Sequence, residues 1–319
     1  MLKREQINKA LFNWLPINVQ ERLGMLRRYS IFGTRGTGTH IIARVDGQSF
    51  HGGLCDRWKG IVSLYAFCKA TRRSFRLHYT FPFNLRDFQV PNQYDWNIND
   101  TDICHSWLHC KMLRLVGDST LTRMLHLPQD QQIHCYANRD WIQIINTTYH
   151  TQYQWGKLFQ ELFRPSPLLT QALTSFEQWT THPYMAVAFR MQNLLGDYPE
   201  YQYQPTSPER QEAIIQRCLD FLRHLHKEHT GNILVTSDSQ RMCEYASQLP
   251  FVFTNNAQAA HVDTVKDAPQ NEYLKSFVDF YLLAGATKVY CAGTEEMYAS
   301  DFPKYAAMVH AIPFERITL

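Results

Sequence analysis

The stretch between residues 40 and 80 constrains the fold more than any other part of the sequence. HIIARV (40–45) is a short apolar run typical of a buried strand, and SFRLHYT (74–80) alternates apolar and polar residues as a strand does. Between them, apolar residues from Trp58 to Cys68 recur at helical spacing. A strand, a helix and a second strand in this order predict a unit of a parallel α/β sheet.

A glycine-rich turn, HGGLCDRWKG (51–60), joins the first predicted strand to the helix. Backbone N–H groups at a helix N-terminus attract anions, and glycine lets the backbone approach a phosphate closely. The spacing matches neither the dinucleotide fingerprint nor the P-loop. Judged on these residues alone, the turn is either an anion site or an ordinary tight turn beside a solvated basic face.

The chain after residue 180 repeats the alternation of strands and helices. Ser207 followed by Pro208 is a typical helix start. The predicted strands are 184–190, 232–237, 251–253 and 287–292, and the predicted helices are 207–228, 239–248, 271–284 and 296–309. This pattern favours a second parallel α/β domain.

Two segments in the middle of the chain are harder to assign. Residues 81–150 contain candidate strands near 112–116, 132–136 and 141–145, whose order the sequence does not give. The helical stretch 155–181 is interrupted by two prolines. We place the domain boundary there, which gives an N-terminal domain of residues 1–175 and a C-terminal domain of residues 176–319.

Composition excludes several classes of protein. The 319-residue chain is 45% hydrophobic with a formal charge of +3, which argues against a disordered chain and against a general nucleic-acid binder. It has no apolar run long enough to span a membrane and no secretory pattern at its start. We therefore expect a cytoplasmic protein that does not bind nucleic acid.

The first 30 residues allow two interpretations. They are rich in lysine and arginine and include the apolar residues Leu11, Phe12 and Trp14. They either pack as a capping helix on the first domain or make weak peripheral contact with an anionic membrane, at its inner face. Pro16 favours the capping helix, because proline interrupts a long amphipathic helix.

The cysteines also leave an alternative open. Eight cysteines are scattered without a CxxC pair, which indicates reduced, buried thiols. CHSWLHC (104–110) brings together two cysteines and two histidines, which are zinc-ligand types. The spacing matches no common zinc module, so we expect no metal site.

Three charged residues stand where open α/β sheets bind ligands or where helices begin. Arg190 ends a predicted strand, and its planar guanidinium suits a phosphate pair. The alternative for Arg190 is a surface salt bridge. Asp238 and Asp279 lie near strand or helix ends, and each is either a ligand contact or a helix cap or solvated acid.

Five motifs in succession carry a resemblance to a known family. They are HGGLCDRWKGIVSLYAFCKATRRSFRLHYTFPFNL, LFRPSPLL, AVAFRMQNLLGD, ILVTSDS and DFYLLAGATKVYCAGT. Their order and spacing resemble the fucosyltransferase-like glycosyltransferases, which include the rhizobial Nod-factor, N-glycan core and protein O-fucosyltransferases. The individual motifs are short, so their order carries the resemblance.

The resemblance implies a GT-B fold, with two Rossmann-like parallel-sheet domains facing a cleft. It implies inverting transfer of fucose from GDP-fucose to an oligosaccharide or glycan precursor, with no metal ion and no other cofactor. Arg190 matches the family's strand-end arginine on the donor diphosphate. The other matched positions are Gly52, Gly53 and Asp56 in the glycine loop, Asn193 and Gly196 after the arginine, Asp279 for guanine, and Asp238 and Thr294 lining the donor site.

Four positions depart from the family's pattern. Ala188 stands where a histidine is frequent, Met191 where a second arginine is frequent, Cys55 where the loop has another glycine, and Glu295 where a serine is common. These departures leave two alternatives open: a catalytically silent nucleotide- or glycan-binding protein on the same fold, and a transferase for a different sugar nucleotide.

The residues are consistent with the implied chemistry. Breaking a sugar–phosphate bond through an oxocarbenium-like state leaves negative charge on the diphosphate. Without a metal, Arg190, backbone N–H groups and a helix N-terminus must stabilise that charge. A general base for the acceptor hydroxyl is also needed, and Asp46 and Asp56 are the candidates.

Overall fold

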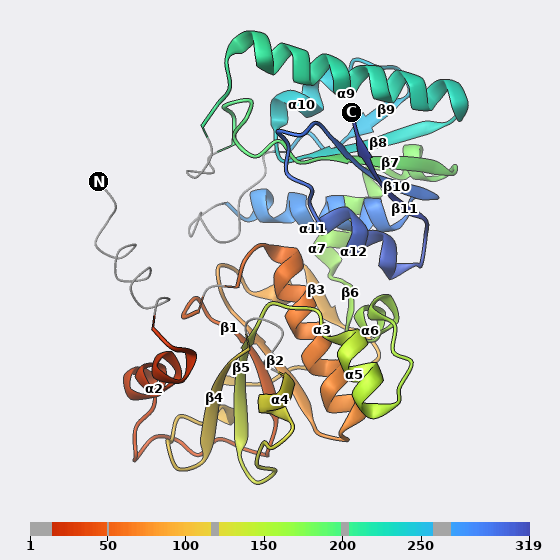
Figure 1. The fold of residues 1–319 in the computed structure, drawn as a ribbon. Helices are drawn as coiled ribbons and strands as arrows, with labels where there is room; N and C mark the ends of the chain where they lie inside the picture. The colour runs from red at the N-terminus through yellow and green to blue at the C-terminus, as the bar shows by residue number, and fades with distance from the viewer. Residues whose placement is uncertain (1–14, 50, 116–120, 199–203, 258–268) are drawn as a thin grey trace. The chain divides into compact units, whose positions relative to one another are not determined.

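The computed structural model describes residues 15–49, 51–115, 121–198, 204–257 and 269–319 (Figure 1). The chain divides into two compact units, each with its own parallel sheet. Unit 1 comprises Met1–Gly52, Asp56–Phe81 and Tyr94–Gln154. Unit 2 comprises Gly53–Cys55, Pro82–Gln93 and Trp155–Leu319.

Unit 1 is built on a four-stranded parallel sheet in the order β2-β1-β5-β4. Its strands are β1 (Ile41–Val45), β2 (Phe75–Tyr79), β4 (Cys110–Leu115) and β5 (Gln132–Ala137). Its helices are α2 (Ile17–Arg28), α3 (Leu54–Ala70), α4 (Leu121–Met124), α5 (Ile142–Tyr149) and the 3-10 turn η2 (Asp100–Asp102). The predicted strand, glycine turn, helix, strand unit at 40–80 is confirmed as β1, α3 and β2.

The two faces of this sheet differ in character. Ile41 and Ala43 of β1 point to an apolar face, beside Ile133 and Cys135 of β5. On the opposite face the register places Arg44 of β1 opposite His78 of β2. The same face carries His134 and Tyr136 of β5, which lie opposite Met112 and Arg114 of β4. Helix α2 packs against β4.

Unit 2 is built on a five-stranded parallel sheet in the order β11-β10-β7-β8-β9. Its strands are β7 (Tyr184–Phe189), β8 (Asn232–Ser237), β9 (Val252–Thr254), β10 (Lys288–Gly293) and β11 (Phe314–Thr318). The chain runs from β7 to β8 and β9, and then crosses to β10 on the other side of β7. The strand order therefore reverses between β7 and β10.

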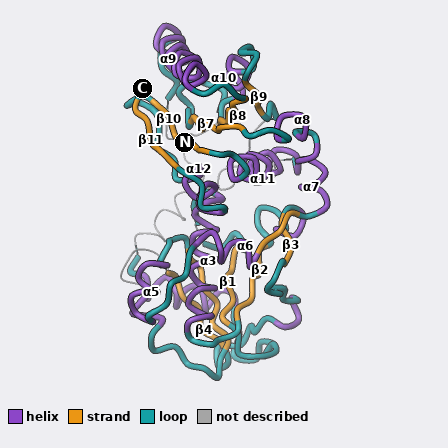
Figure 2. The backbone as a smooth tube through the Cα atoms, turned by 90° about the vertical axis from the view of Figure 1, so that its right-hand side faces the viewer, coloured by secondary structure: helices purple, strands orange, loops and turns teal. Residues whose placement is uncertain are grey.

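Helices cover both faces of the unit 2 sheet, with α9 and α10 on one side and α11 and α12 on the other (Figure 2). The helices are α6 (Trp155–Leu162), α7 (Pro167–Thr174), α8 (Glu177–Thr180), α9 (Pro208–Glu228), α10 (Gln240–Ala246), α11 (Gln270–Ala284) and α12 (Phe302–Val309). The 3-10 turn η1 (Leu85–Asp87) and an antiparallel pair, β3 (Gln89–Pro91) and β6 (Phe163–Pro165), complete the unit. As predicted, Ser207 caps α9, with its hydroxyl accepting from the N–H of Arg210.

The core beside α9 and α10 is apolar throughout. Val187 and Phe189 of β7 pack with Ile233 and Val235 of β8 and with Leu222 of α9. All five of these side chains are at most 2% exposed. This is the pattern expected for a parallel sheet that is covered on both faces.

The structure corrects one prediction about secondary structure and adds a strand that was not predicted. Residues 141–145, predicted as a strand, belong to helix α5, where Ile142 and Ile145 are buried on one face and Asp140 accepts from the N–H of Ile142 (2.9 Å). A short apolar run does not reveal its period, so strand and helix are easily confused. The sequence also gave no sign of β11, which is mostly exposed.

The division between the units falls elsewhere than the expected boundary at residue 175. Helix α6 packs against α12, and α7 packs against α11, so the segment from Trp155 onward lies with unit 2. Residues 82–93 also lie with unit 2, because β3 pairs with β6. Among the described residues, no helix is long and apolar enough to cross a membrane.

Candidate functional site

The carboxyl edge of the unit 2 sheet collects three of the predicted site residues. Arg190 follows β7, Asp238 follows β8 and Thr294 follows β10. In open α/β sheets, ligands bind outside the carboxyl ends of the strands, where the strand order reverses. This reversal lies between β7 and β10. We therefore take this edge as the candidate site.

Arg190 and Asp238 form an ion pair at the centre of this edge. Nη1 of Arg190 donates to Oδ2 of Asp238 at 2.6 Å. The carboxylate also accepts from the backbone N–H groups of Met191 (2.8 Å) and Gln192 (2.7 Å). The Asp238 side chain is 5% exposed, whereas that of Arg190 is 21% exposed. Asp238 therefore fixes the guanidinium, part of which remains accessible.

The loop that follows Arg190 is tied to the start of α10. Asp197 Oδ2 accepts from the hydroxyl of Ser239 (2.8 Å) and from the N–H of Arg241 (2.9 Å). The ring of Tyr198 lies under the Arg190 guanidinium, 5.1 Å from its carbon. Asp197 was not predicted as a site residue, although it is the last residue of the motif AVAFRMQNLLGD. Its position at the end of that loop was the one feature of the sequence that could have indicated a role.

Asn193 and Gly196 shape the same loop. The N–H of Gly196 donates to the carbonyl of Asn193 at 3.0 Å. Gly196 has φ +79°, in the left-handed region that favours glycine. An added Cβ there would lie no closer than 3.6 Å to Pro205. The backbone angle, rather than a lack of space, therefore calls for glycine.

Thr294 presents an unsatisfied hydroxyl at the end of β10. The residue is 4% exposed, and its Oγ1 is buried without a hydrogen-bond partner among the described residues. A buried polar atom without a partner is uncommon in folded proteins. The next residue, Glu295, is exposed. Glu296 pairs with Arg210 of α9.

Asp279 lies inside unit 2 in a closed polar group. Its Oδ2 accepts from Lys275 Nζ (2.7 Å), and its Oδ1 accepts from the amide of Asn255 (3.0 Å). Burial alone would lower the pKa of Lys275, but the charge of Asp279 raises it above its usual value. Both carboxylate oxygens are engaged. A guanine base would have to displace Asn255 or Lys275, so recognition of guanine by Asp279 stays a prediction.

The glycine turn in front of α3 is held by an internal arginine. Arg57, 1% exposed, donates from Nε to the carbonyl of Gly52 (3.2 Å) and from Nη1 to Tyr79 Oη (3.0 Å) and the carbonyl of Phe81 (2.8 Å). The alternative of a solvated basic face beside the turn does not hold at Arg57, because its guanidinium is directed into the turn.

The two glycines of the turn have different constraints. Gly52 has φ +80°, and a Cβ there would lie 2.5 Å from Asp56 Oδ2. A Cβ on Gly53 would meet nothing within 4 Å among the described residues. Asp56 is 43% exposed and pairs with Lys59 at 3.0 Å. The fold therefore requires glycine at position 52, whereas a Cβ at position 53 would have room.

Of the two candidate bases, Asp46 is the more restrained. Its Oδ2 accepts from Arg44 (2.9 Å) and from the hydroxyl of Tyr136 (2.9 Å), and its Oδ1 accepts from the N–H of Gln48 (3.1 Å). Burial alone would raise the pKa of Asp46, but Arg44 and Arg28 hold it below its usual range. Asp46 is therefore a weak proton acceptor.

The cysteine and histidine segment at 104–110 is structural. The thiols of Cys104 and Cys110 both approach the carbonyl of Ser106, at 3.7 and 3.1 Å. All eight cysteines of the chain are buried free thiols. In the part of the chain that the structure describes, no group of three or more histidine, cysteine or acidic side chains is arranged for a metal ion.

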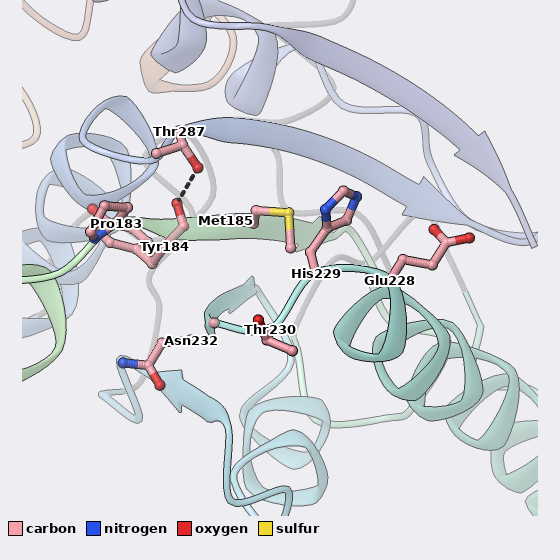
Figure 3. Close-up of a pocket in the computed structure, with 9 residues that line it drawn as sticks. Pro183, Tyr184, Met185, Glu228, His229, Thr230, Asn232 and Thr287 are labelled. Atoms are coloured by element: carbon pink, nitrogen blue, oxygen red, sulfur yellow. Dashed lines mark hydrogen bonds between the residues drawn. The ribbon is translucent and has the colours of Figure 1, made fainter.

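A cavity lies in unit 2 away from this site. It has a volume of about 390 Å³ and is lined by Tyr184, His229, Asn232 and Thr287, among others (Figure 3). Tyr184 begins β7 and Asn232 begins β8, so the cavity lies at the amino edge of the sheet. Thr287 closes one side by donating to the carbonyl of Tyr184 (2.9 Å). The cavity is at the opposite edge from Arg190.

Comparisons with known proteins bear on the fold. No protein-family model matches the sequence, and a search of curated proteins finds no significant match. A mutant of FUT1 from Arabidopsis thaliana in complex with GDP matches with a TM-score of 0.55 and 11% identity, over 97% of this chain and 77% of that one. NodZ alpha-1,6-fucosyltransferase co-crystallized with GDP matches with a TM-score of 0.51 and 14% identity, over 85% of this chain and 92% of that one.

A NodZ alpha-1,6-fucosyltransferase crystal soaked with GDP-fucose matches with a TM-score of 0.50 and 13% identity, over 86% of this chain and 93% of that one. These likenesses cover most of each chain and concern the fold. They confirm the expected α/β, GT-B class with two Rossmann-like parallel-sheet units. The resemblance to fucosyltransferase-like proteins therefore holds in three dimensions.

Proposed function

We propose that this protein is a glycosyltransferase that transfers fucose from GDP-fucose to an oligosaccharide or glycan precursor, with inversion and without a metal ion. The observation that carries the proposal is the position of Arg190. It lies, oriented by Asp238, where the unit 2 sheet reverses its strand order. Three solved structures of this fold contain GDP or were soaked with GDP-fucose, according to their descriptions.

Arg190 is suited to stabilise the leaving diphosphate. As the sugar–phosphate bond breaks, negative charge grows on the diphosphate oxygens. A guanidinium held by a buried carboxylate is already oriented, so it loses little side-chain freedom when the charge develops. Removing one such preorganised donor costs roughly 100- to 1,000-fold in rate in other enzymes. The unsatisfied hydroxyl of Thr294 is a second donor at the same edge.

An inverting displacement also needs a base for the acceptor hydroxyl. Asp46 is held by Arg44, Tyr136 and Gln48, which lowers its basicity. Asp56 is 43% exposed and has a single ion-pair partner, Lys59, in the described contacts. We therefore assign the base role to Asp56 in preference to Asp46. Asp56→Asn should remove transfer while leaving GDP binding in place.

Thermal unfolding with and without GDP tests the donor assignment. GDP should raise the melting temperature of the wild-type protein, and Arg190→Ala should abolish the shift. Arg223→Ala is the matched control, because Arg223 is a half-exposed arginine of unit 2 that pairs with Asp220 on α9. If GDP gave no shift, or if Arg190→Ala retained the full shift, the proposal would be wrong.

A catalytically silent binding protein is the second candidate. Ala188 and Met191 are buried, at 8% and 0% exposure, so neither supplies the polar nucleotide contact that is common in the resembling family. Incubation with GDP-fucose and a glycan array separates the two functions. Fucosylated product excludes the silent protein, whereas GDP binding without product supports it. A donor-hydrolysis panel of sugar nucleotides would identify a different donor sugar.

Two further expectations remain proposals. The protein is expected in the cytoplasm, with weak peripheral contact between residues 1–30 and the inner face of a membrane. Residues 1–14 lie outside the described residues. In the rest of this segment, α2 packs against β4, which fits the capping-helix interpretation.

A further inference from the structure

Two segments of unit 1 that are distant in sequence lie side by side at one end of α2. The N–H of Ser30 donates to the carbonyl of His105 (2.9 Å), and the N–H of Trp107 donates to the carbonyl of Ser30 (3.2 Å). The indole N–H of Trp107 donates to the carbonyl of Met25 (3.1 Å). Residues 25–32 and 105–108 therefore present one continuous surface.

Five large apolar side chains are exposed on these segments. They are Phe32 (96% exposed), Leu108 (61%), Leu26 (59%), Ile31 (52%) and Trp107 (37%), and together we call them the apolar loop surface. Single exposed apolar side chains are ordinary, but a group on adjoining segments marks an interaction site.

The backbone holds these side chains outward. A Cβ on Gly33 would overlap the carbonyl of His105, and one on Gly36 would overlap the carbonyl of Asp102. The hydroxyl of Ser106 donates to the carbonyl of Ile31 (3.3 Å). The loop is therefore packed closely against residues 102–106, and Phe32 is 96% exposed on it.

Exposed cationic side chains lie on or next to the segments of the apolar loop surface. They are Arg22, Arg27, Arg35 and Lys111, the last on β4. The one acidic residue in the stretches 15–35 and 104–111 is Glu21, which is buried. Its carboxylate is bound by Arg123 (2.5 Å) and by the N–H of Arg114 (2.6 Å). These stretches therefore carry exposed cations and no exposed acid, whereas Asp102, in the segment packed against the loop, accepts from the hydroxyl of Thr37 (2.7 Å).

We propose that the apolar loop surface docks unit 1 on an anionic lipid bilayer. Apolar side chains on a cation-rimmed surface match the two components of such a bilayer, acyl chains below and anionic headgroups above. Trp107 suits the boundary between acyl chains and headgroups, since its ring is apolar and its indole N–H already donates to the carbonyl of Met25. The proposal extends the contact expected through residues 1–30, because Arg22, Leu26 and Arg27 belong to that segment whereas residues 31–35 and 105–111 do not. It is independent of the transfer activity.

Sedimentation with vesicles of phosphatidylcholine, with and without phosphatidylserine, tests the proposal. The wild-type protein should bind the vesicles that contain phosphatidylserine, and added salt should weaken binding. Ile31→Ser combined with Phe32→Ser should weaken it by at least about tenfold. Arg22→Glu and Lys111→Glu should each weaken it by about fivefold or more, since each cation near an anionic surface contributes about 1 kcal/mol.

Matched controls change exposed residues of unit 2. Tyr298→Ser removes a side chain that is 55% exposed, and Lys227→Glu reverses an exposed charge on α9. Neither should change vesicle binding. A thermal unfolding transition close to that of the wild-type protein would show that the Ile31 and Phe32 variant is folded.

Three outcomes would overturn the proposal. One is no binding of the wild-type protein to anionic vesicles, and another is undiminished binding of the Ile31→Ser and Phe32→Ser variant. The third is a wild-type dimer that ignores vesicles and dissociates in this variant, as seen by sedimentation velocity. That result would assign the surface to a protein interface.

Discussion

The two parallel sheets place their polar residues differently. In unit 2 the central strand β7 is apolar along its length, and Arg190 and Asp238 follow the carboxyl ends of β7 and β8. In unit 1 one face carries Arg44, His78 and His134 beside the apolar Ile42 and Met112, and α2 packs against β4. Polar groups at the edge of a sheet are available to a ligand. Polar groups on a covered face are shielded from water, so they depend on one another for hydrogen bonds.

We expect the buried charges of unit 1 to affect mainly its stability, and the charges at the edge of unit 2 to affect mainly ligand binding. Arg44 Nε and Nη1 and His51 Nε2 are buried without hydrogen-bond partners among the described residues. Such groups cost free energy in the folded state. We therefore expect substitutions in the two regions to affect different properties.

Arg190→Ala should give the largest effect on activity. We expect transfer to fall by roughly 100- to 1,000-fold, because a preorganised donor to the leaving diphosphate is lost. The midpoint of urea unfolding should fall less than in Arg44→Met, because the Arg190 side chain is 21% exposed whereas that of Arg44 is 9% exposed. If Arg190→Ala lost much stability and kept normal GDP affinity, Arg190 would contribute to folding and not to binding, which would contradict the distinction drawn between the two sheets.

Arg44→Met should act mainly on stability. Removing one partner of a buried ion pair leaves Asp46 without its guanidinium, at a cost of about 3 kcal/mol in the free energy of unfolding. GDP affinity should not change. The double variant with Asp46→Asn should lose less than the sum of the two single changes, because the residues share one network. Additive losses would show that the pair is not coupled.

Acid should destabilise the polar region of unit 1. Burial lowers the pKa of His51 to about 3 and also lowers the pKa of His134. The unfolded chain takes up protons near pH 6.5 while these folded histidines stay neutral. The free energy of unfolding should therefore fall as the pH drops below 6.5, by up to about 1.4 kcal/mol per pH unit for each histidine.

Urea unfolding at pH 7 and pH 5 measures this effect. His51→Gln and His134→Gln should each flatten the pH dependence, because the variant no longer gains a proton on unfolding. His224→Gln is the control, since His224 is exposed on α9 of unit 2. If both unit 1 variants kept the pH dependence of the wild-type protein, His51 and His134 would not be the cause of the loss of stability in acid.

The glycine turn should show the smallest effect. Gly52→Ala should destabilise the protein by about 1 to 3 kcal/mol, because φ is positive and a Cβ would meet Asp56. Gly53→Ala should be nearly neutral for stability. If Gly53→Ala nevertheless weakens GDP binding in a melting-shift assay, the turn contributes to donor binding. Equal, large losses of stability at both positions would contradict the geometry.

Much of the fold could be predicted from the sequence, because the strands and helices of unit 2 have clear periodicity. The strand predicted at 232–237 matches β8 at both ends. The polar face of unit 1 was harder to predict, although the alternation in SFRLHYT placed Arg76 and His78 on one side of a strand. Which face a helix or loop covers depends on contacts between distant segments.

The candidate site could be predicted residue by residue but not as an arrangement. Arg190, Asp238 and Thr294 were each identified, and the structure brings them to one edge of the sheet. The pairing of Arg190 with Asp238 joins residues that are 48 positions apart, so no local pattern reveals it. Arg57 was misjudged for the same reason, because its partner Tyr79 lies on the next strand.

A crystal structure of the complex with GDP tests the central claim most directly. The account predicts that a diphosphate oxygen lies within hydrogen-bond distance of the Arg190 guanidinium, at the carboxyl edge between β7 and β10. Arg190 should still contact Asp238 in the complex. GDP bound at another place, with Arg190 turned away from the diphosphate, would contradict it.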